Sequence, residues 1–230
     1  REKPASSPVM FQTWSNLLFL HWEIDVQEIA KRIPNRLSVD LHEGKTYLGL
    51  IPFFMRKVRP RFLPQMPGLS NFLELNIRAY VHDEQGRPGV WFFSLDCDQP
   101  IAEEVARKFF HLPYQHAEMS TQGSVYRCQR KNCEEKAVFD YEGSGKLRTA
   151  KPGSLEFFLL ERYLLFSESR GGKIHCGKVQ HSPYQFTEAR VRRSSQAPLK
   201  WEKFSVENEP TSQLYSPGVP VSIHPLRPVD

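Results

Sequence analysis

The chain has 230 residues, of which 40% are hydrophobic and 12% aromatic, which is enough for one sizeable core. Its net charge of +5 permits acidic partners, but the Lys and Arg residues are spread along the chain, which favours a solvated surface over a nucleic-acid-binding patch. No apolar run approaches the ~20 residues of a membrane span, the N-terminus lacks a signal-peptide core, and four cysteines are too few for a disulfide scaffold. We therefore expect a cytoplasmic protein without a membrane or nucleic-acid partner.

The start of the chain predicts a strand and a helix. Residues 1–9 are expected to form a flexible arm in front of a single domain that spans residues 10–230. Residues 11–22 are apolar and predict a long first strand. The side chain of Asp25 can accept a hydrogen bond from an unpaired backbone N–H, so it is expected to cap a helix over residues 26–33.

A hairpin and a proline-rich loop follow this helix. Residues 37–41 and 45–54 are expected to pair with each other around a glycine turn, and the second of these strands is apolar on both faces. Residues 56–69 contain three prolines and predict a stiff loop, a kind of segment often found beside a site. This loop begins with the basic run of residues 56–61.

The most regular pattern lies in residues 72–81, where the side chains alternate strictly between two faces of a strand. Glu74, Asn76 and Arg78 share one face, while the opposite face is apolar. A turn rich in Gly and Pro then leads into a return strand over residues 90–95. A polar stripe of this kind fits either a solvent-facing side or an interior pocket, and the apolar flanking strands argue for the pocket.

The rest of the chain predicts helices over residues 100–110 and 154–163, with short strands between and after them. We find no internal repeat and no low-complexity segment. About ten strands with two or three short helices indicate an α+β protein, mostly β, in which an antiparallel sheet curls or closes into a barrel.

Several segments resemble the YqjF-like family, a domain of unknown function within the acetoacetate decarboxylase-like superfamily. The segments that carry the resemblance are HWEIDVQEIAKRIPNRLSVDLHEGKTYLGLIPFFM, FLELNIRAYV, GRPGVWFFSLD, FHLPYQHAEM, FLLERYLLFS and GKVQHSPY. Together they cover most of the chain. The resemblance implies a cone-shaped antiparallel β-barrel with a central cavity.

The same resemblance argues against decarboxylation through a Schiff base. The decarboxylases use a lysine whose pKa is lowered by an adjacent lysine, and that pair follows an aromatic-Pro dipeptide. The matching position here reads Leu112-Pro113-Tyr114-Gln115, so both lysines are missing. The matching glutamate is present as Glu74, but the second glutamate and the arginine of the decarboxylases have no counterpart.

The candidate site combines the polar stripe with two residues implied by the resemblance. Glu74 is expected to act as acid or base, and Tyr114 and His116 occupy the edge of the site where the lysines would lie. Asn76 and Arg78 are expected to bind the ligand, because a guanidinium in a pocket favours a carboxylate or phosphate. A lone buried charge is costly, so Glu74 and Arg78 each require a partner or a bound ligand if they are interior. Tyr114 and His116 equally fit a space-filling role.

No metal and no cofactor is expected. Cysteine and histidine residues occur at C-x4-C and H-C-x4-H spacings, in distant segments, whereas zinc sites usually combine two tight pairs. The residues concerned are Cys128, Cys133, His175, Cys176 and His181.

Two functions remain open from the sequence. The first is a barrel that binds a small, perhaps anionic, organic acid or metabolite, either as an enzyme or as a binding protein, and that is not an acetoacetate decarboxylase. The second is a non-catalytic ligand sensor, or a module that binds protein or nucleic acid through the basic residues 56–61. Self-association fits both. A closed cavity around Glu74 and Arg78 would favour the first, and a solvent-facing position would favour the second.

Overall fold

A computed structural model describes residues 6–229, which fold mainly into β-strands. The described strands are β1 (Met10–Ile24), β2 (Leu37–Val39), β3 (Thr46–Pro60), β4 (Phe72–Asp83), β5 (Pro88–Cys97), β6 (Tyr114–Gln122), β7 (Val125–Arg130), β8 (Ala137–Arg148), β9 (Leu164–Glu168), β10 (Ile174–His181), β11 (Phe186–Arg193), β12 (Ser212–Ile223) and β13 (Arg227–Pro228). The described helices are α1 (Val26–Ala30), α2 (Pro100–Phe110), α3 (Leu155–Leu160) and α4 (Ala197–Trp201).

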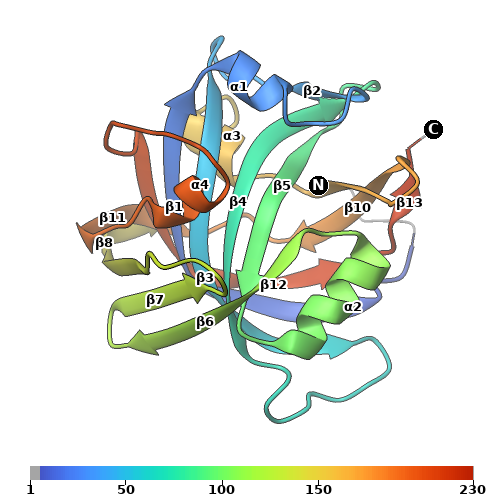
Figure 1. Cartoon of the computed structure of the whole chain (residues 1–230), viewed down its shortest axis with the longest axis horizontal. Coiled ribbons are helices and arrows are strands. Elements are labelled where there is room, and N and C mark those ends of the chain that lie inside the picture. The colour runs from blue at the N-terminus through green and yellow to red at the C-terminus, as the bar shows by residue number, and fades with distance from the viewer. Residues whose placement is uncertain (1–5, 230) are drawn as a thin grey trace.

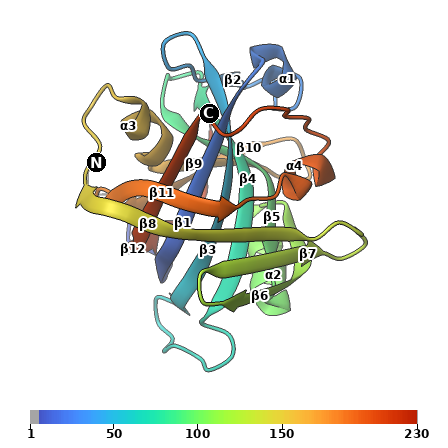
Figure 2. The same ribbon diagram turned by 90° about the vertical axis from the view of Figure 1, so that its left-hand side faces the viewer.

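The strands close into a ring, which leaves an enclosed interior. The ring runs β1–β3–β4–β5–β9–β10–β12 and returns to β1, and every pairing in it is antiparallel except β5–β9. A second arc, β6–β7–β8–β11, connects β5 to β12 outside this ring. Figure 2 shows β7 and β8 crossing the outer face of β1, β3 and β4. The prediction of a mostly antiparallel β-barrel is confirmed.

Strand β4 is buried on both faces because it separates two hydrophobic cores. Its residues Leu73, Leu75 and Ile77 face outward from the ring and pack in a core that includes residues of α1, α4, β7 and β8. Phe72 and Tyr80 face the interior of the ring, with aromatic residues of β1 and β3. The strict alternation of the sequence therefore corresponds to two interior faces, and no face of β4 is left to solvent.

The helices begin where the sequence supplies caps. The Asp25 carboxylate accepts a hydrogen bond from the backbone N–H of Gln27 at 2.6 Å and begins α1, as predicted. Gln99 caps α2, and the hydroxyl of Ser154 caps α3. The longest helix within residues 6–229 is α2, with 11 residues, and none of the described helices has the length and hydropathy needed to cross a bilayer.

Several local predictions were wrong. Strand β2 pairs with β4 and not with β3, because β1 and β4 already occupy both edges of β3. Strand β3 continues to Pro60, so the loop is shorter than residues 56–69; a proline is tolerated at a strand end because few ladder bonds are lost there. Helix α4 was not predicted. Of the expected arm, residues 1–5 lie outside the described residues, and Val9 hydrogen-bonds to Ile223 in the barrel.

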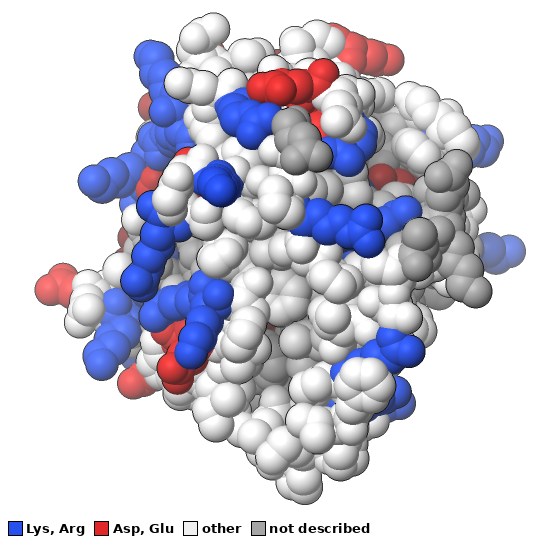
Figure 3. Space-filling model, turned by 90° about the vertical axis from the view of Figure 1, so that its right-hand side faces the viewer, with Lys and Arg blue, Asp and Glu red and all other residues white. Residues whose placement is uncertain are grey.

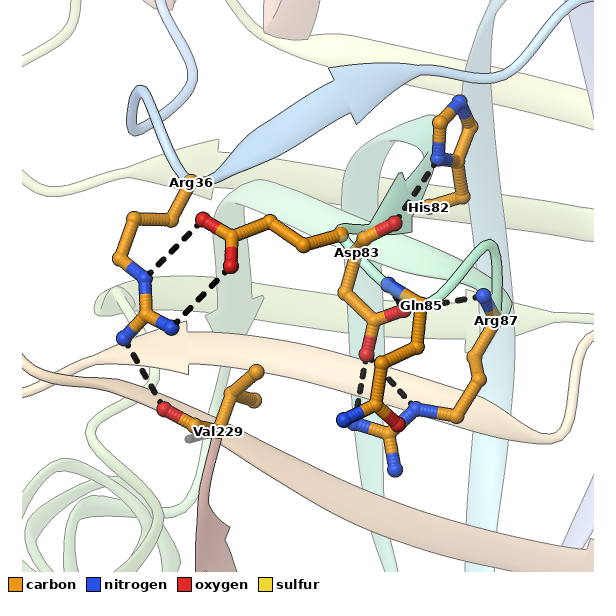
Figure 4. A network of polar contacts seen from close by, with 7 residues as sticks. Arg36, His82, Asp83, Gln85, Arg87 and Val229 are labelled. Atoms are coloured by element: carbon orange, nitrogen blue, oxygen red, sulfur yellow. Dashed lines mark hydrogen bonds and ion pairs between the residues drawn. The ribbon is translucent and has the colours of Figure 1, made fainter.

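The turn between β4 and β5 is held by a network of polar contacts, drawn in Figure 4. The buried carboxylate of Asp83 accepts hydrogen bonds from two backbone N–H groups of the turn and from Nε of Arg87, at 2.7–3.1 Å. Beside it, Arg36 hydrogen-bonds to Glu84 and to the carbonyl oxygen of Val229. This network fixes the end of β4 that lies farthest from the loop between β3 and β4.

Candidate functional site

The ring of strands encloses a cavity of about 260 Å³. Its wall is mostly apolar and comes from β1, β3, β4, β5 and α2, and the loop between β3 and β4 contributes to it as well. Figure 1 places this loop and α2 at the same end of the barrel. Four polar side chains predicted from the sequence pattern or the resemblance line the cavity, namely Glu74, Asn76, Arg78 and Tyr114. The polar stripe of β4 therefore lies on the cavity wall.

Glu74 is a buried carboxyl group with a single strong side-chain partner. The hydroxyl of Tyr114 donates a hydrogen bond to Oε2 of Glu74 at 2.6 Å. Burial raises the pKa of Glu74 to about 7, because the hydrogen bonds from Tyr114 and Asn76, which favour the ionised form, offset only part of the desolvation. A carboxyl group with a pKa near neutral exchanges protons readily at physiological pH, which is the property required of a general acid or base.

Two polar groups lie beside Glu74 on the two faces of β4: a tyrosine hydroxyl that binds its backbone, and the amide of Asn76. On the opposite face of β4, the Tyr126 hydroxyl donates a hydrogen bond to the carbonyl oxygen of Glu74 at 2.8 Å. Inside the cavity, Oδ1 of Asn76 is buried and has no hydrogen-bond partner within the described residues. A buried acceptor without a partner is costly in a protein interior, and it therefore indicates a position for a donor group of a ligand or for a water molecule.

Arg78 lies deeper along β4 and presents unused donors. Its Nη2 donates to the carbonyl oxygen of Leu159 at 2.9 Å and to the Tyr80 hydroxyl at 3.3 Å, whereas Nε is buried without a partner. No carboxylate in the described part of the chain forms an ion pair with this guanidinium. Glu74 and Arg78 are four strand positions apart, roughly 13 Å, so they do not neutralise each other. Burial therefore affects the two groups differently. Glu74 can be neutral, whereas the guanidinium of Arg78 donates to uncharged oxygens and has no carboxylate partner in the described chain.

A second guanidinium, Arg162, also lines the cavity. Its Nη1 donates to Oδ2 of Asp40 at 2.5 Å, and its Cζ lies 5.2 Å from the ring centre of Tyr80, beside which Arg78 Cζ lies at 5.5 Å. Burial lowers the pKa of Arg162, and the nearby positive charge of Arg78 acts in the same direction. The sequence did not indicate Arg162, because its segment was predicted to be a helix over residues 154–163, whereas α3 ends at Leu160 and Arg162 lies in the loop that follows.

A neutral histidine lies near Arg78, outside the cavity wall. Nε2 of His21 lies 2.7 Å from the Tyr80 hydroxyl. Burial lowers the pKa of His21 well below its usual range, and the charge of Arg78 lowers it further, so the imidazole is uncharged. His21 therefore orients the Tyr80 hydroxyl beside Arg78 without adding charge.

His116 lies elsewhere. It follows Tyr114 by two residues on β6, but its side chain is partly exposed and its Nδ1 lies 3.5 Å from Oε2 of Glu103 on α2. It is absent from the wall of the cavity. The structure thus brings Tyr114 to Glu74 and leaves His116 at the outside, next to α2.

The described cavity wall contains no lysine. Tyr114 is buried and Gln115 is exposed, so only the first of the two positions that match the decarboxylase lysines faces the interior. Within residues 6–229, no three His, Cys, Asp or Glu side chains are grouped closely enough to hold a metal ion.

Comparisons with known proteins agree with this architecture. The chain is 37% identical over 191 residues to the uncharacterized protein YqjF of Bacillus subtilis strain 168, a match that covers 81% of this chain and 78% of that protein. Among solved structures it is similar to an acetoacetate decarboxylase-like enzyme from Sphingomonas wittichii RW1, with a TM-score of 0.64, 11% identity and coverage of 97% and 94% of the two chains.

Two further solved structures have the same fold. The enduracididine biosynthesis enzyme MppR complexed with pyruvate matches with a TM-score of 0.61 and 13% identity, and covers 100% of this chain and 93% of that chain. The acetoacetate decarboxylase of Legionella pneumophila matches with a TM-score of 0.61 and 12% identity, and covers 100% and 91%. At these identities the likeness shows the fold alone. The family model DUF2071, described as an uncharacterized conserved protein, matches residues 11–220, and the chain belongs to this family.

Proposed function

We propose that the cavity binds a small organic acid, with the acid group at Arg78 and an apolar body against the hydrophobic wall. The observation that carries this proposal is the buried guanidinium of Arg78, which has an unpartnered Nε and no carboxylate in the described chain to balance it. A buried cation without a counter-ion is costly, and an incoming carboxylate removes that cost while accepting charge-assisted hydrogen bonds. Arg162, near the same tyrosine ring, adds further positive potential.

The size of the cavity limits the ligand. Ligand pockets for drug-sized molecules span about 300–1,000 Å³, and this cavity of about 260 Å³ falls just below that range. A short aliphatic or aromatic acid fits such a volume, whereas a nucleotide does not. Support also comes from the structural neighbour MppR, which has been solved in complex with pyruvate, a small keto acid.

Catalysis, in this proposal, is proton transfer by Glu74. With a pKa of about 7, Glu74 is present in both protonation states at neutral pH, and Tyr114 at 2.6 Å orients its carboxyl group. For Glu74 to take or give a proton while the anionic group binds at Arg78, the acid must be long enough to span most of the roughly 13 Å between the two strand positions. Imine chemistry is not part of the proposal, because the cavity wall of the described chain contains no lysine.

The alternative based on the basic residues 56–61 has weaker support. Glu74 and Arg78 face the cavity rather than solvent, and that position favours the small-molecule function. Arg56 and Arg59 lie over the rings of Phe54 and Phe11, at 4.9 and 4.6 Å, so both guanidinium groups already contact aromatic rings of the protein itself. We also propose a reducing, cytoplasmic location, which the four unpaired cysteines support.

The test is calorimetric titration with a panel of small acids, such as pyruvate, acetoacetate, hexanoate and benzoate, and with their uncharged amides. We expect at least one acid to bind more tightly than its amide, and we expect Arg78→Gln to weaken that binding by about tenfold to 100-fold, since a charge-assisted pair contributes about 1.5–3 kcal/mol. The matched control is Arg190→Gln, which removes an exposed arginine on β11. Equal affinity for acids and amides, or unchanged binding by Arg78→Gln, would overturn the proposal.

A further inference from the structure

Exposed apolar side chains gather around the mouth of the cavity. In the loop between β3 and β4, the side chain of Phe62 is 87% exposed, and on α2 that of Phe109 is 64% exposed. The same two elements carry further exposed apolar side chains, namely Leu63, Met66, Ile101 and Val105. Single exposed apolar residues are normal, but a contiguous group on two adjacent elements marks an interaction surface.

The two elements are joined into one rim by a hydrogen bond. Nε2 of Gln99, the residue that caps α2, donates to the carbonyl oxygen of Gly68 in the loop at 2.8 Å. The Ser70 hydroxyl accepts a hydrogen bond from the backbone N–H of Met66 at 2.8 Å. Met66, Ile101 and Val105 are exposed and also line the cavity, so the apolar surface continues from the outside into the interior.

Positive charge flanks this apolar surface. Residues 56–70 contain four Lys or Arg and no acidic residue. Helix α2 adds Arg107 and Lys108 against Glu103 and Glu104, and Arg107 is paired with Glu103. In Figure 3, the lower centre of the face shown is an area without charged side chains. Lys and Arg lie on both sides of it, and on the left some Asp or Glu side chains lie beside them.

We propose that this rim docks on an anionic lipid surface, with Phe62 and Phe109 inserted among the headgroups. Apolar residues flanked by cations are the pattern of proteins that bind peripherally to membranes, where the apolar groups enter the interface and the cations meet acidic lipids. The apolar wall of the cavity then opens directly onto the bilayer, which suits entry of a ligand with an apolar body. Docking of this kind needs no spanning segment, and the expectation that the protein has no membrane partner rested only on the absence of such a segment.

A second copy of the chain fits this surface less well. A symmetric contact brings the same patch of both copies together, so the cations of residues 56–61 would approach those of the other copy. Like charges across an interface cost free energy, whereas an anionic bilayer complements them. The proposal does not depend on the acid site at Arg78, because the rim residues and that site are different parts of the structure.

The experiment is co-sedimentation with vesicles made of equal parts phosphatidylcholine and phosphatidylglycerol, compared with vesicles of phosphatidylcholine alone. We expect binding to the anionic vesicles that weakens at high salt. Phe62→Ser with Phe109→Ser is expected to abolish it. Arg56→Gln with Arg61→Gln is expected to weaken it by about tenfold or more, given roughly 1 kcal/mol for each cation near such a surface.

Two control pairs separate the rim from general surface effects. Leu41→Ser with Leu147→Ser removes exposed apolar residues elsewhere, and Arg190→Gln with Arg193→Gln removes exposed cations on β11. Both control proteins should bind like the unmodified protein, and thermal unfolding checks that all variants fold. The proposal is overturned if the unmodified protein does not bind anionic vesicles. It is also overturned if Phe62→Ser with Phe109→Ser dissociates a dimer in sedimentation equilibrium without changing vesicle binding.

Discussion

Strand β4 carries a buried carboxyl group at each end, and the two differ in almost every physical respect. Asp83 accepts three hydrogen bonds from the β4–β5 turn, including one from the guanidinium of Arg87, whereas Glu74 receives one strong bond, from Tyr114. Burial works against ionisation at both positions. At Asp83 the bonds from Arg87 and the backbone outweigh burial and lower the pKa, while at Glu74 burial dominates and raises the pKa to about 7.

This difference separates a structural carboxylate from a candidate functional one. A group whose donors all come from the protein has no capacity left for a ligand, and Asp83 is such a group (Figure 4). The end of β4 at Glu74 leaves acceptors and donors without partners, on Asn76 and Arg78. Unsatisfied polar groups in a native interior require an explanation, and the proposed ligand would supply one here.

The largest expected effect on stability comes from removing Asp83, the carboxylate whose hydrogen bonds all come from the protein. Asp83→Ala removes the acceptor for two backbone N–H groups and leaves Arg87 without its carboxylate, so we expect the free energy of unfolding to fall by roughly 3–4 kcal/mol. Urea denaturation at neutral pH measures this change. The control is Glu84→Ala, which removes an exposed partner of Arg36 and should cost less than about 1 kcal/mol. Equal costs for the two variants would contradict the contrast between the ends of β4.

Stability measured as a function of pH tests Glu74, near the opposite end of β4. The raised pKa of Glu74 means that its contribution to stability is complete below the unfolded value of about 4.5 and is lost as pH rises through about 7. Glu74→Gln removes this dependence while keeping the shape of the side chain. We expect the stability of this variant, relative to the unmodified protein, to rise by roughly 3 kcal/mol between about pH 4 and about pH 8.

Urea denaturation across that pH range gives the measurement. The contribution of Asp83 to stability depends on pH with the opposite sign. Because its pKa is lowered in the folded protein, it stabilises the fold above the unfolded pKa, and this stabilisation is lost in acid. The comparison of Glu74→Gln with the unmodified protein cancels this contribution, since both contain Asp83. A difference that stays flat with pH would show that Glu74 is not desolvated in the folded protein.

A smaller effect is expected at Tyr114. Its hydroxyl lowers the pKa of Glu74, so Tyr114→Phe should raise that pKa above about 7, and the lost hydrogen bond should cost about 1 kcal/mol of stability. Carbon NMR of the Glu74 carboxyl group follows the titration. The control is Tyr126→Phe, which removes a hydrogen bond to the backbone oxygen of the same residue from the opposite face and should leave the titration of the carboxyl group unchanged.

The fold was largely predictable because local signals agreed with the final packing. The period-two pattern of residues 72–81 fixed which side chains of β4 share a face, and the cap at Asp25 placed the start of α1. Strand partners were harder, since they depend on which edges remain free. Nothing in residues 37–39 shows that β3 is already flanked by β1 and β4, so the pairing of β2 with β4 could not be predicted.

The site was predictable where it follows the pattern of a single strand. Glu74, Asn76 and Arg78 came from one alternating segment, but Arg162 comes from the turn after α3 and reaches the cavity only through the closure of the ring. His116, like Tyr114, was assigned to the edge of the site by the resemblance to the decarboxylases. Its strand carries it toward α2, where it lies near Glu103. For both Arg162 and His116, the position of the residue in the folded chain decides whether its side chain lines the cavity.

The last prediction concerns the amine that this end of β4 lacks. The described cavity wall has no lysine, and a lysine side chain in water has a reference pKa near ~10.4, so it reacts slowly with keto acids at neutral pH. We therefore expect no stoichiometric trapping when borohydride is added with acetoacetate or pyruvate, and no release of carbon dioxide from acetoacetate above background. Rapid, saturable, one-to-one trapping by the unmodified protein would contradict this.

A lysine placed at position 114 sharpens the same test. In Tyr114→Lys the new ammonium lies beside Glu74, whose carboxylate stabilises the charged form and works against the lowering of the lysine pKa by burial. Adding Glu74→Gln removes that carboxylate, so desolvation acts alone and the amine is expected to become partly neutral at neutral pH. A lysine at position 115 adds nothing to either variant, because Gln115 is exposed on the other face of β6.

We expect slow, saturable trapping of pyruvate only in the variant that combines Tyr114→Lys with Glu74→Gln, measured as the mass of the reduced adduct. If Tyr114→Lys alone traps pyruvate as fast as the combined variant, then Glu74 does not control the charge at this end of the strand.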